Sequence, residues 1–202
     1  MKEQTKDSRT AKVHPLILIG IILLAAGVGL FVYVQAQNAR LEQRTESILK
    51  ELNEVIPDGS GEQSPAYVGK DDLDPDSEET MPMVEIKGSS CVGRLSIPAL
   101  HRAWPVGSMY GNLKEMPCHS TGTPEKGHFR IRGLHDRYRF SEVSSLTPKT
   151  EVTFTTVDGI DYRYRVVGIH EGDQWSAVKS GLVLYYRTQG GQRMMVDCSR
   201  ID

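Results

Sequence analysis

Residues 151–167, EVTFTTVDGIDYRYRVV, decide the fold of this chain. β-branched and aromatic residues alternate with polar ones on both sides of Asp158-Gly159, and an Asp-Gly pair between two such runs is a strong signal for a tight turn. The pattern predicts a β-hairpin made of Glu151–Thr156 and Tyr162–Val167.

Similar short runs lie on both sides of this hairpin. The clearest ones are Val92–Ile97, Phe129–Arg132, Leu182–Tyr186 and Arg193–Val196, and the second hairpin strand extends to Ile169. After residue 84 no helical periodicity is longer than about two turns. Closely spaced strands with turns between them predict a mainly β domain over residues 84–202, an antiparallel sandwich or a small barrel rather than a βαβ fold.

The N-terminal part differs sharply from this domain. Residues 15–34, PLILIGIILLAAGVGLFVYV, carry no charge, and as a helix they would reach ~30 Å, the thickness of the hydrocarbon core of a bilayer. The length favours a retained transmembrane anchor over residues 15–37. Val34-Gln35-Ala36 would be a weak site for a signal peptidase, so a cleaved signal is the alternative.

Basic residues flank this apolar stretch unevenly. Four precede it and two follow it closely: Lys2, Lys6, Arg9 and Lys12, against Arg40 and Arg44. Positive charge tends to stay on the cytoplasmic side. We therefore expect a cytoplasmic tail at 1–14, a single pass through the cell membrane, and an extracellular C-terminal domain.

Two segments separate the anchor from the β domain. Residues 38–56 place Leu41, Ile48, Leu52 and Val55 near one helical face, which predicts a juxtamembrane stalk helix; a dimerising helix is the weaker reading, since fewer than three heptads are present. Residues 57–83 carry eight acids and one base, which predicts a disordered, self-repelling acidic linker. An acidic docking motif or a calcium site is the alternative there.

Charge and composition exclude several function classes. Residues 84–202 carry sixteen bases and twelve acids, and a surplus of four without a basic run is too weak for nucleic-acid binding. The sequence has no metal-ligand cluster and no phosphate-binding loop, so no cofactor is expected. Glu115 and Glu125 could bind calcium from loops, but solvated surface carboxylates are the favoured reading.

Three cysteines, Cys91, Cys118 and Cys198, make an odd number without a C-x-x-C pair. At least one thiol stays unpaired within the chain. Cys91 and Cys118 could bridge in an oxidising compartment and leave Cys198 free, but the sequence does not decide this. Cys198 ends a predicted strand, and His135 follows another one, so a thiol and an imidazole could meet.

Residues 92–198 resemble the catalytic domain of the sortases of Gram-positive bacteria. Val92–Leu100, VGRLSIPAL, followed by Trp104-Pro105-Val106, is similar to the opening strand of that family. Gly127–Asp136 resembles the strand that ends in the family's Gly-His, and Glu151–Val167 matches the hairpin that follows. The interval of 63 residues from His135 to Cys198 also fits.

This resemblance implies a closed β-barrel and a membrane-bound cysteine transpeptidase. Because such an enzyme first cleaves a peptide bond with a thiol, it is also classed as a hydrolase and a thiol protease. Such an enzyme cleaves an LPxTG-like sorting signal of a surface protein or pilin, forms a thioester, and passes the acyl group to an amine of peptidoglycan or a pilin. By this resemblance Cys198 would be the nucleophile and His135 its acid–base partner. An arginine normally stabilises the oxyanion, and Arg200 is the candidate here.

The chain departs from the family pattern at three places. Asp197 stands where the family has a threonine before the cysteine, and Leu134 separates Gly133 from His135. The family's arginine lies on a strand well after the cysteine, whereas this chain ends four residues after Cys198. We therefore expect a C-terminus truncated before the final strand, with an exposed sheet edge. The alternative function is a catalytically impaired homologue that acts as an extracytoplasmic binding module.

Overall fold

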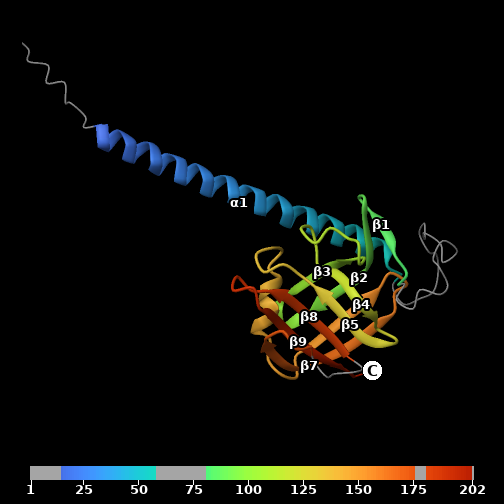
Figure 1. Cartoon of the computed structure of the whole chain (residues 1–202). Helices are drawn as coiled ribbons and strands as arrows, with labels where there is room; N and C mark the ends of the chain where they lie inside the picture. The colour runs from blue at the N-terminus through green and yellow to red at the C-terminus, as the bar shows by residue number, and fades with distance from the viewer. Residues whose placement is uncertain (1–14, 58–80, 176–180, 202) are drawn as a thin grey trace, which may run out of the picture. The chain divides into compact units, whose positions relative to one another are not determined.

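The computed structural model describes residues 15–57, 81–175 and 181–201, and it divides into two compact units, Met1–Ala39 and Arg40–Asp202 (Figure 1). The acidic linker falls almost entirely outside the described residues, as does the tail at 1–14. The first unit carries the apolar part of helix α1 (Pro15–Val55), whose large side chains are mostly exposed. α1 is long and apolar enough to cross a membrane.

The second unit contains nine described strands in one sheet. They are β1 (Val84–Ile86), β2 (Ser89–Ile97), β3 (Arg102–Gly107), β4 (Cys118–Thr123), β5 (Gly127–Arg132), β6 (Glu151–Thr156), β7 (Asp161–Glu171), β8 (Gly181–Arg187) and β9 (Arg193–Arg200). Two short 3₁₀ helices, η2 (Pro98–Leu100) and η3 (Phe140–Ser145), connect some of them.

The strand order is β1-β2-β3-β4-β5-β8-β9-β7-β6, and β2 also pairs with β6. This last pairing closes β2 to β9 into a barrel of eight strands, with β1 added outside the ring. The expected closed barrel is thereby confirmed. Most neighbours are antiparallel, but β3 with β4 and β5 with β8 are parallel. β3 and β4 pair at a single position, Gly107 with Cys118.

The predicted hairpin forms from β6 and β7. Val152 pairs with Tyr164 and Phe154 with Tyr162, so the aromatic side chains of both strands face the barrel interior together. Gly159 has a φ of +79° in the connecting turn, a conformation that glycine adopts without steric cost. This local pattern explains why the hairpin could be recognised in the sequence.

The main core fills the barrel. Its largest fully buried side chains include Leu95, Ile97, Phe129, Ile131 and Phe154. Phe129 and Phe154 meet edge to face, with ring centroids 4.7 Å apart. Along each strand these residues alternate with outward-facing ones, which is the period-two pattern of a strand with one buried face.

A second core forms where the C-terminal part of α1 packs on the barrel. Ile48 and Leu52 are fully buried there, in one cluster with Ile86, Met116 and Cys118. The helical residues after Ala39 therefore pack on the β domain. The sequence identified the apolar face of this helix correctly, but the face is covered by the β domain itself.

Polar contacts fix this helix along its length. Glu42 pairs with Arg139 at 3.3 Å, and Glu51 pairs with Lys87 at 3.2 Å. The Thr45 hydroxyl donates a buried hydrogen bond to the Glu115 carbonyl. Glu115 is itself buried beside Arg44 and Ser89, so the structure uses it to hold the helix.

The C-terminal strand β9 pairs with β7 on one side and with β8 on the other. The pairing with β8 extends from Arg193, opposite Arg187, to Ser199, opposite Gly181. The barrel therefore closes within the described residues, and the expectation of an exposed edge at the Cys198 strand is wrong.

All three cysteines are free and buried. Cys91 and Cys118 lie on either side of Gly107 in the strand register, which separates their Cα atoms by two strand spacings, ~9–10 Å. A disulfide needs less than ~7 Å. Burial raises the pKa of Cys91 to about 12 and that of Cys118 to about 11, so both thiols are protonated at neutral pH.

Candidate functional site

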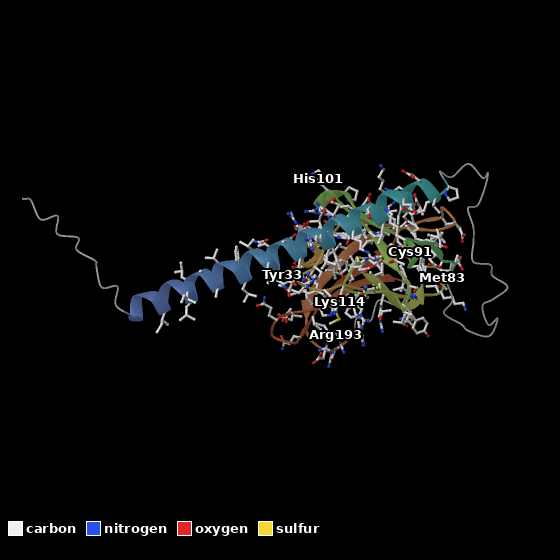
Figure 2. The ribbon with its side chains drawn as sticks, turned by 90° about the horizontal axis from the view of Figure 1, so that it is seen from above. Tyr33, Met83, Cys91, His101, Lys114 and Arg193 are labelled. Carbon is white, nitrogen blue, oxygen red and sulfur yellow. The ribbon has the colours of Figure 1, made fainter. Side chains whose placement is uncertain are left out.

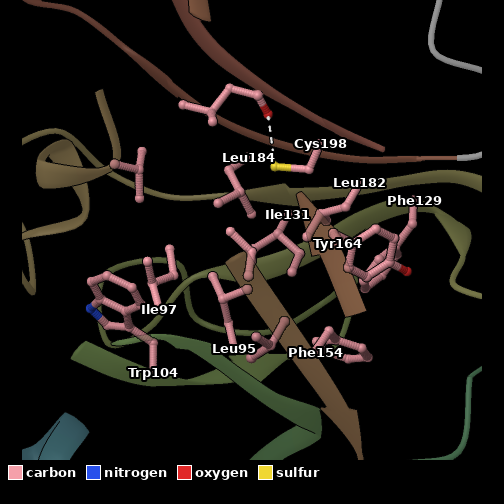
Figure 3. Close-up of a cluster of buried hydrophobic side chains, with 14 of the residues drawn as sticks. Leu95, Ile97, Trp104, Phe129, Ile131, Phe154, Tyr164, Leu182, Leu184 and Cys198 are labelled. Carbon is pink, nitrogen blue, oxygen red and sulfur yellow. Dashed lines mark hydrogen bonds between the residues drawn. The ribbon is translucent and has the colours of Figure 1, made fainter. Parts of the chain in front are cut away.

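Cys198 lies inside the barrel core. Its side chain is fully buried, and the thiol faces the backbone carbonyl of Val196 at 3.9 Å (Figure 3). Val196 and Cys198 alternate with outward-facing residues on β9, so the strand itself directs the sulfur inward. Burial, and next the charge of Asp197, raise the pKa of the Cys198 thiol well above its usual range. This thiol is protonated and shielded from solvent.

His135 follows β5 and is about one-third exposed. Its ring centroid lies 5.4 Å from that of Tyr186, and its Nδ1 lies 2.5 Å from the Asp136 carboxylate. Gly133 makes this position possible, because a Cβ there would lie 2.0 Å from the ring of Phe140. The backbone at Gly133 thus lies close to the Phe140 ring, and the His135 imidazole lies at the end of β8.

The structure does not bring Cys198 and His135 together. Cys198 pairs with Leu182, whereas His135 lies beside Tyr186, four residues further along β8. Four residues of a strand span ~13 Å. The sulfur also faces the core, while the imidazole lies at the barrel rim. The two predicted catalytic groups are therefore at different levels of the barrel and in different environments.

Arg200 is the last residue of β9. Its guanidinium donates a hydrogen bond to the Pro124 carbonyl at 3.0 Å and lies 4.8 Å from the centre of the Tyr162 ring. β9 runs away from His135 toward this residue. Arg200 is thus on the strand of Cys198, as expected, but lies at the end of β9 away from His135.

Other residues occupy the strand ends beside His135. Tyr186 and Arg187 end β8, and Arg193, which opens β9, pairs with Arg187. Arg187 and Arg193 therefore lie opposite each other at the strand ends beside His135.

Four arginines from three neighbouring strands point outward near this end of the barrel. They define the surface that we call the arginine face: Arg130, Arg132, Arg187 and Arg193. Their orientation follows from strand alternation, since Phe129, Ile131 and Leu184 point inward between them. The parallel pairing of β5 with β8 places Arg132 opposite Tyr185.

Trp175, from the segment after β7, lies against the arginine face. Its ring centre is 4.0 Å from the Arg130 guanidinium carbon and 4.7 Å from that of Arg193. It also meets Tyr185 edge to face, with centroids 5.1 Å apart. Arginines at such distances interact favourably with the π system of an indole. The residue as a whole remains 38% exposed, so this part of the surface combines a partly exposed aromatic residue with neighbouring positive charge.

Few acids balance these arginines. Arg193 pairs with Asp173 at 3.7 Å, and Arg187 donates to the Gly191 carbonyl at 2.9 Å. No described carboxylate forms an ion pair with Arg130, Arg132 or Arg187. The arginine face is therefore a surface of net positive charge that includes an exposed aromatic ring, a combination suited to an anionic ligand.

The arginine face was not predicted from the sequence. The alternation within Phe129–Arg132 and Leu182–Tyr186 could have placed Arg130, Arg132 and Arg187 on outward positions. These arginines form one surface only because β5 pairs with β8. The two strands are about fifty residues apart in sequence, so local patterns do not reveal that pairing. Trp175 lies outside any strand pattern, and nothing in its local sequence marks it.

Comparison with solved structures adds an independent observation on the fold. The pilus-related sortase C of Group B Streptococcus matches with a TM-score of 0.51, over 83% of this chain and 89% of that structure, at 17% sequence identity. The chain has a sortase-like fold. Sortase C from Clostridium perfringens SM101 matches over 85% of this chain and 99% of its own, at 14% identity and a TM-score of 0.49.

Sortase A from Corynebacterium diphtheriae also matches, at 17% identity and a TM-score of 0.49, and the sortase-like chain spans 62% of its length. No protein-family model matches the sequence, and no curated protein matches it. The comparisons thus establish the sortase-like barrel, while the roles of individual side chains rest on the geometry given above.

Proposed function

We propose that this chain is a membrane-anchored, extracytoplasmic binding module built on a sortase-like barrel, and that its arginine face holds an acidic peptide segment of a surface protein or pilin. The observation that carries the proposal is the position of Cys198, whose sulfur is enclosed in the core ~13 Å along the strand from the level of His135. A buried protonated thiol is a poor nucleophile.

The spacing of the arginines favours an extended peptide as the ligand. Arg130 and Arg132 are two residues apart on β5, which places their side chains ~7 Å apart on one face. Acidic side chains at alternate positions of an extended peptide have the same repeat. Guanidinium groups bind carboxylates through paired hydrogen bonds, and Trp175 would cover an apolar part of the ligand.

The membrane anchor is the second part of the proposal. α1 supplies the apolar segment, and the bias of basic residues before it favours a cytoplasmic N-terminus. With this topology the barrel and its arginine face lie outside the cell. Surface proteins and pilins are accessible to it there.

Binding is tested with the full chain in nanodiscs and a fluorescent peptide that alternates glutamate with threonine. We expect saturable binding that weakens as salt increases. The double variant Arg132→Ala/Arg187→Ala should bind at least about tenfold more weakly, which corresponds to 1.4 kcal/mol. Arg165→Ala is the matched control, because Arg165 is an exposed arginine on β7 that pairs with Glu151. Equal binding of the glutamine version of the peptide would refute an acidic ligand.

The enzymatic alternative is tested separately. The same preparation is incubated with LPxTG-like peptides, with and without hydroxylamine, and its mass is measured. We expect no acyl adduct on Cys198 and no cleavage. A thioester on Cys198 would overturn the binding-module proposal and restore the cysteine transpeptidase with Cys198 and His135.

A further inference from the structure

A pocket of about 210 Å³ lies between the docked part of α1 and the barrel, within the second unit. Its walls come from one helix face, strand β3 with the turn before it, and the segment before η3: Glu42, Thr45, Glu46, Leu49, His101, Arg102, Ala103, Trp104 and Tyr138. Figure 2 shows His101 and Arg193 on opposite sides of the barrel, so this pocket is separate from the arginine face.

The floor of the pocket is aromatic and fixed. The Trp104 indole N–H donates to the Tyr138 carbonyl at 2.7 Å, and the Trp104 ring meets Phe140 edge to face. The Tyr138 hydroxyl accepts from the Leu134 amide at 2.9 Å and faces the Leu113 carbonyl at 3.2 Å. The polar atoms of both aromatic residues are thus occupied, and both side chains are buried at the base of the pocket, with Trp104 2% exposed and Tyr138 8% exposed.

The charged side chains at the pocket differ in whether they form ion pairs. Glu42 pairs with Arg139, and Arg102 pairs with Glu142, each at 3.3 Å. Glu46, one helical turn after Glu42 on the same face, makes no ion pair or hydrogen bond with any described residue. One carboxylate is therefore left over at the mouth of a pocket with aromatic and aliphatic walls.

Size and charge together select the ligand. A volume of 210 Å³ equals about seven waters at ~30 Å³ each in the liquid, which leaves room for a short alkyl chain with a charged head. One uncompensated negative charge suits a single organic cation better than a divalent metal, which prefers several oxygen ligands. The partly exposed apolar side chains of Leu49 and Ala103 suit the methylene groups of such a cation.

We propose that this pocket binds a primary alkylammonium group, such as a lysine side chain, with the ammonium at Glu46 and the methylene chain against Leu49 and Ala103, above the buried Trp104. The site is independent of the arginine face and of any role for Cys198. It would be a second binding site on another side of the barrel, for a cation, whereas the arginine face would bind an anion.

Trp104 provides a direct readout. The chain has two tryptophans, so Trp175→Phe leaves Trp104 as the sole indole, in the wall of the pocket. In this background the full chain is titrated in nanodiscs with n-butylammonium chloride, and with n-butanol as the neutral analogue. We expect a saturable change in Trp104 emission with the ammonium and at least tenfold weaker binding of the alcohol.

Glu46→Gln should reduce the affinity for butylammonium at least tenfold, while Glu54→Gln, an exposed glutamate of the same helix outside the pocket, should leave it unchanged. Ala103→Leu, which fills the pocket, should remove the response to both ligands. Thermal unfolding of each variant establishes that it is folded. Equal affinity for butanol, or unchanged affinity in Glu46→Gln, would overturn the proposal.

Discussion

The ring of His135 lies 5.4 Å from the ring of Tyr186 at the end of β8, while Cys198 pairs with Leu182 at the start of the same strand. A histidine can therefore stand beside a strand end in this barrel, as a cysteine–histidine pair would require. The side chain that it meets there is a tyrosine. The cysteine belongs instead to the hydrophobic interior, and its replacement should affect folding before it affects any surface function.

Cys198→Ala should lower the free energy of unfolding by about 1–2 kcal/mol, because it removes one buried sulfur and leaves a small cavity. Urea denaturation followed by fluorescence measures this change. Binding of the acidic peptide to the folded variant should be the same as in the unchanged chain. A variant of full stability that loses peptide binding or peptide cleavage would assign Cys198 to a functional site.

Alkaline pH should destabilise the barrel through its buried thiols. In the unfolded chain a thiol has a pKa of ~8.5, whereas burial raises the pKa of Cys91 to about 12 and that of Cys118 to about 11. Below pH ~8.5 the thiols are protonated in both the folded and the unfolded chain, so they do not reduce the free energy of unfolding. Above it the unfolded state loses protons that the folded state keeps, so the free energy of unfolding falls by up to about 1.4 kcal/mol per pH unit for each thiol.

Urea denaturation at about pH 7.5 and about pH 10 measures this slope. Cys91→Ala should make the decline shallower, since one of the contributing thiols is then absent. Glu85→Ala, which changes an exposed side chain of β1 next to this core and does not titrate in this pH range, serves as the control. An identical slope in Cys91→Ala would show that this thiol does not contribute.

Leu52→Ala should destabilise the second unit by about 2–5 kcal/mol, because Leu52 is fully buried between α1 and the barrel. Lys50→Ala, an exposed position of the same helix, should change stability by less than about 0.5 kcal/mol. Thermal unfolding of the two variants in nanodiscs makes the comparison. Equal stability of both would mean that residues 40–56 do not dock on the barrel in solution.

Gly133→Ala should lower the free energy of unfolding by about 1–3 kcal/mol. An added Cβ would lie 2.0 Å from the ring of Phe140, so the ring or the backbone before His135 must move. Gly168→Ala on β7 is the matched control, because no atom lies within 4 Å of its added Cβ. Chemical denaturation of both variants tests the difference, and similar losses would argue against the close contact with Phe140.

The fold was accessible from the sequence because strand alternation and the Asp158-Gly159 turn are local signals. The candidate site was not. The run Arg193–Val196 suggested that Cys198 stood at a strand end, but β9 continues to Arg200, which makes Cys198 an interior strand position facing the core. The direction of a side chain near a strand end depends on how far pairing continues, and this is set by distant partners on β7 and β8.

The helix before the barrel shows the same limit. Positions Ile48 and Leu52 were correctly assigned to one apolar face, because helical periodicity is local. An apolar face indicates that something covers it, but not what does so. Here the cover is β1 and the residues around Met116, far along the chain.

The parallel junction of β3 and β4 makes the helix important for more than docking. A single pairing, Gly107 with Cys118, joins these strands, and Ile48 and Leu52 share a core with Cys118 at that junction. Side-chain contacts from α1 thus compensate for backbone hydrogen bonds that the ladder lacks there. Any force or partner that lifts residues 40–56 would open the barrel at this seam first, and amide deuterium uptake would begin in β4 while β8 and β9 remained protected.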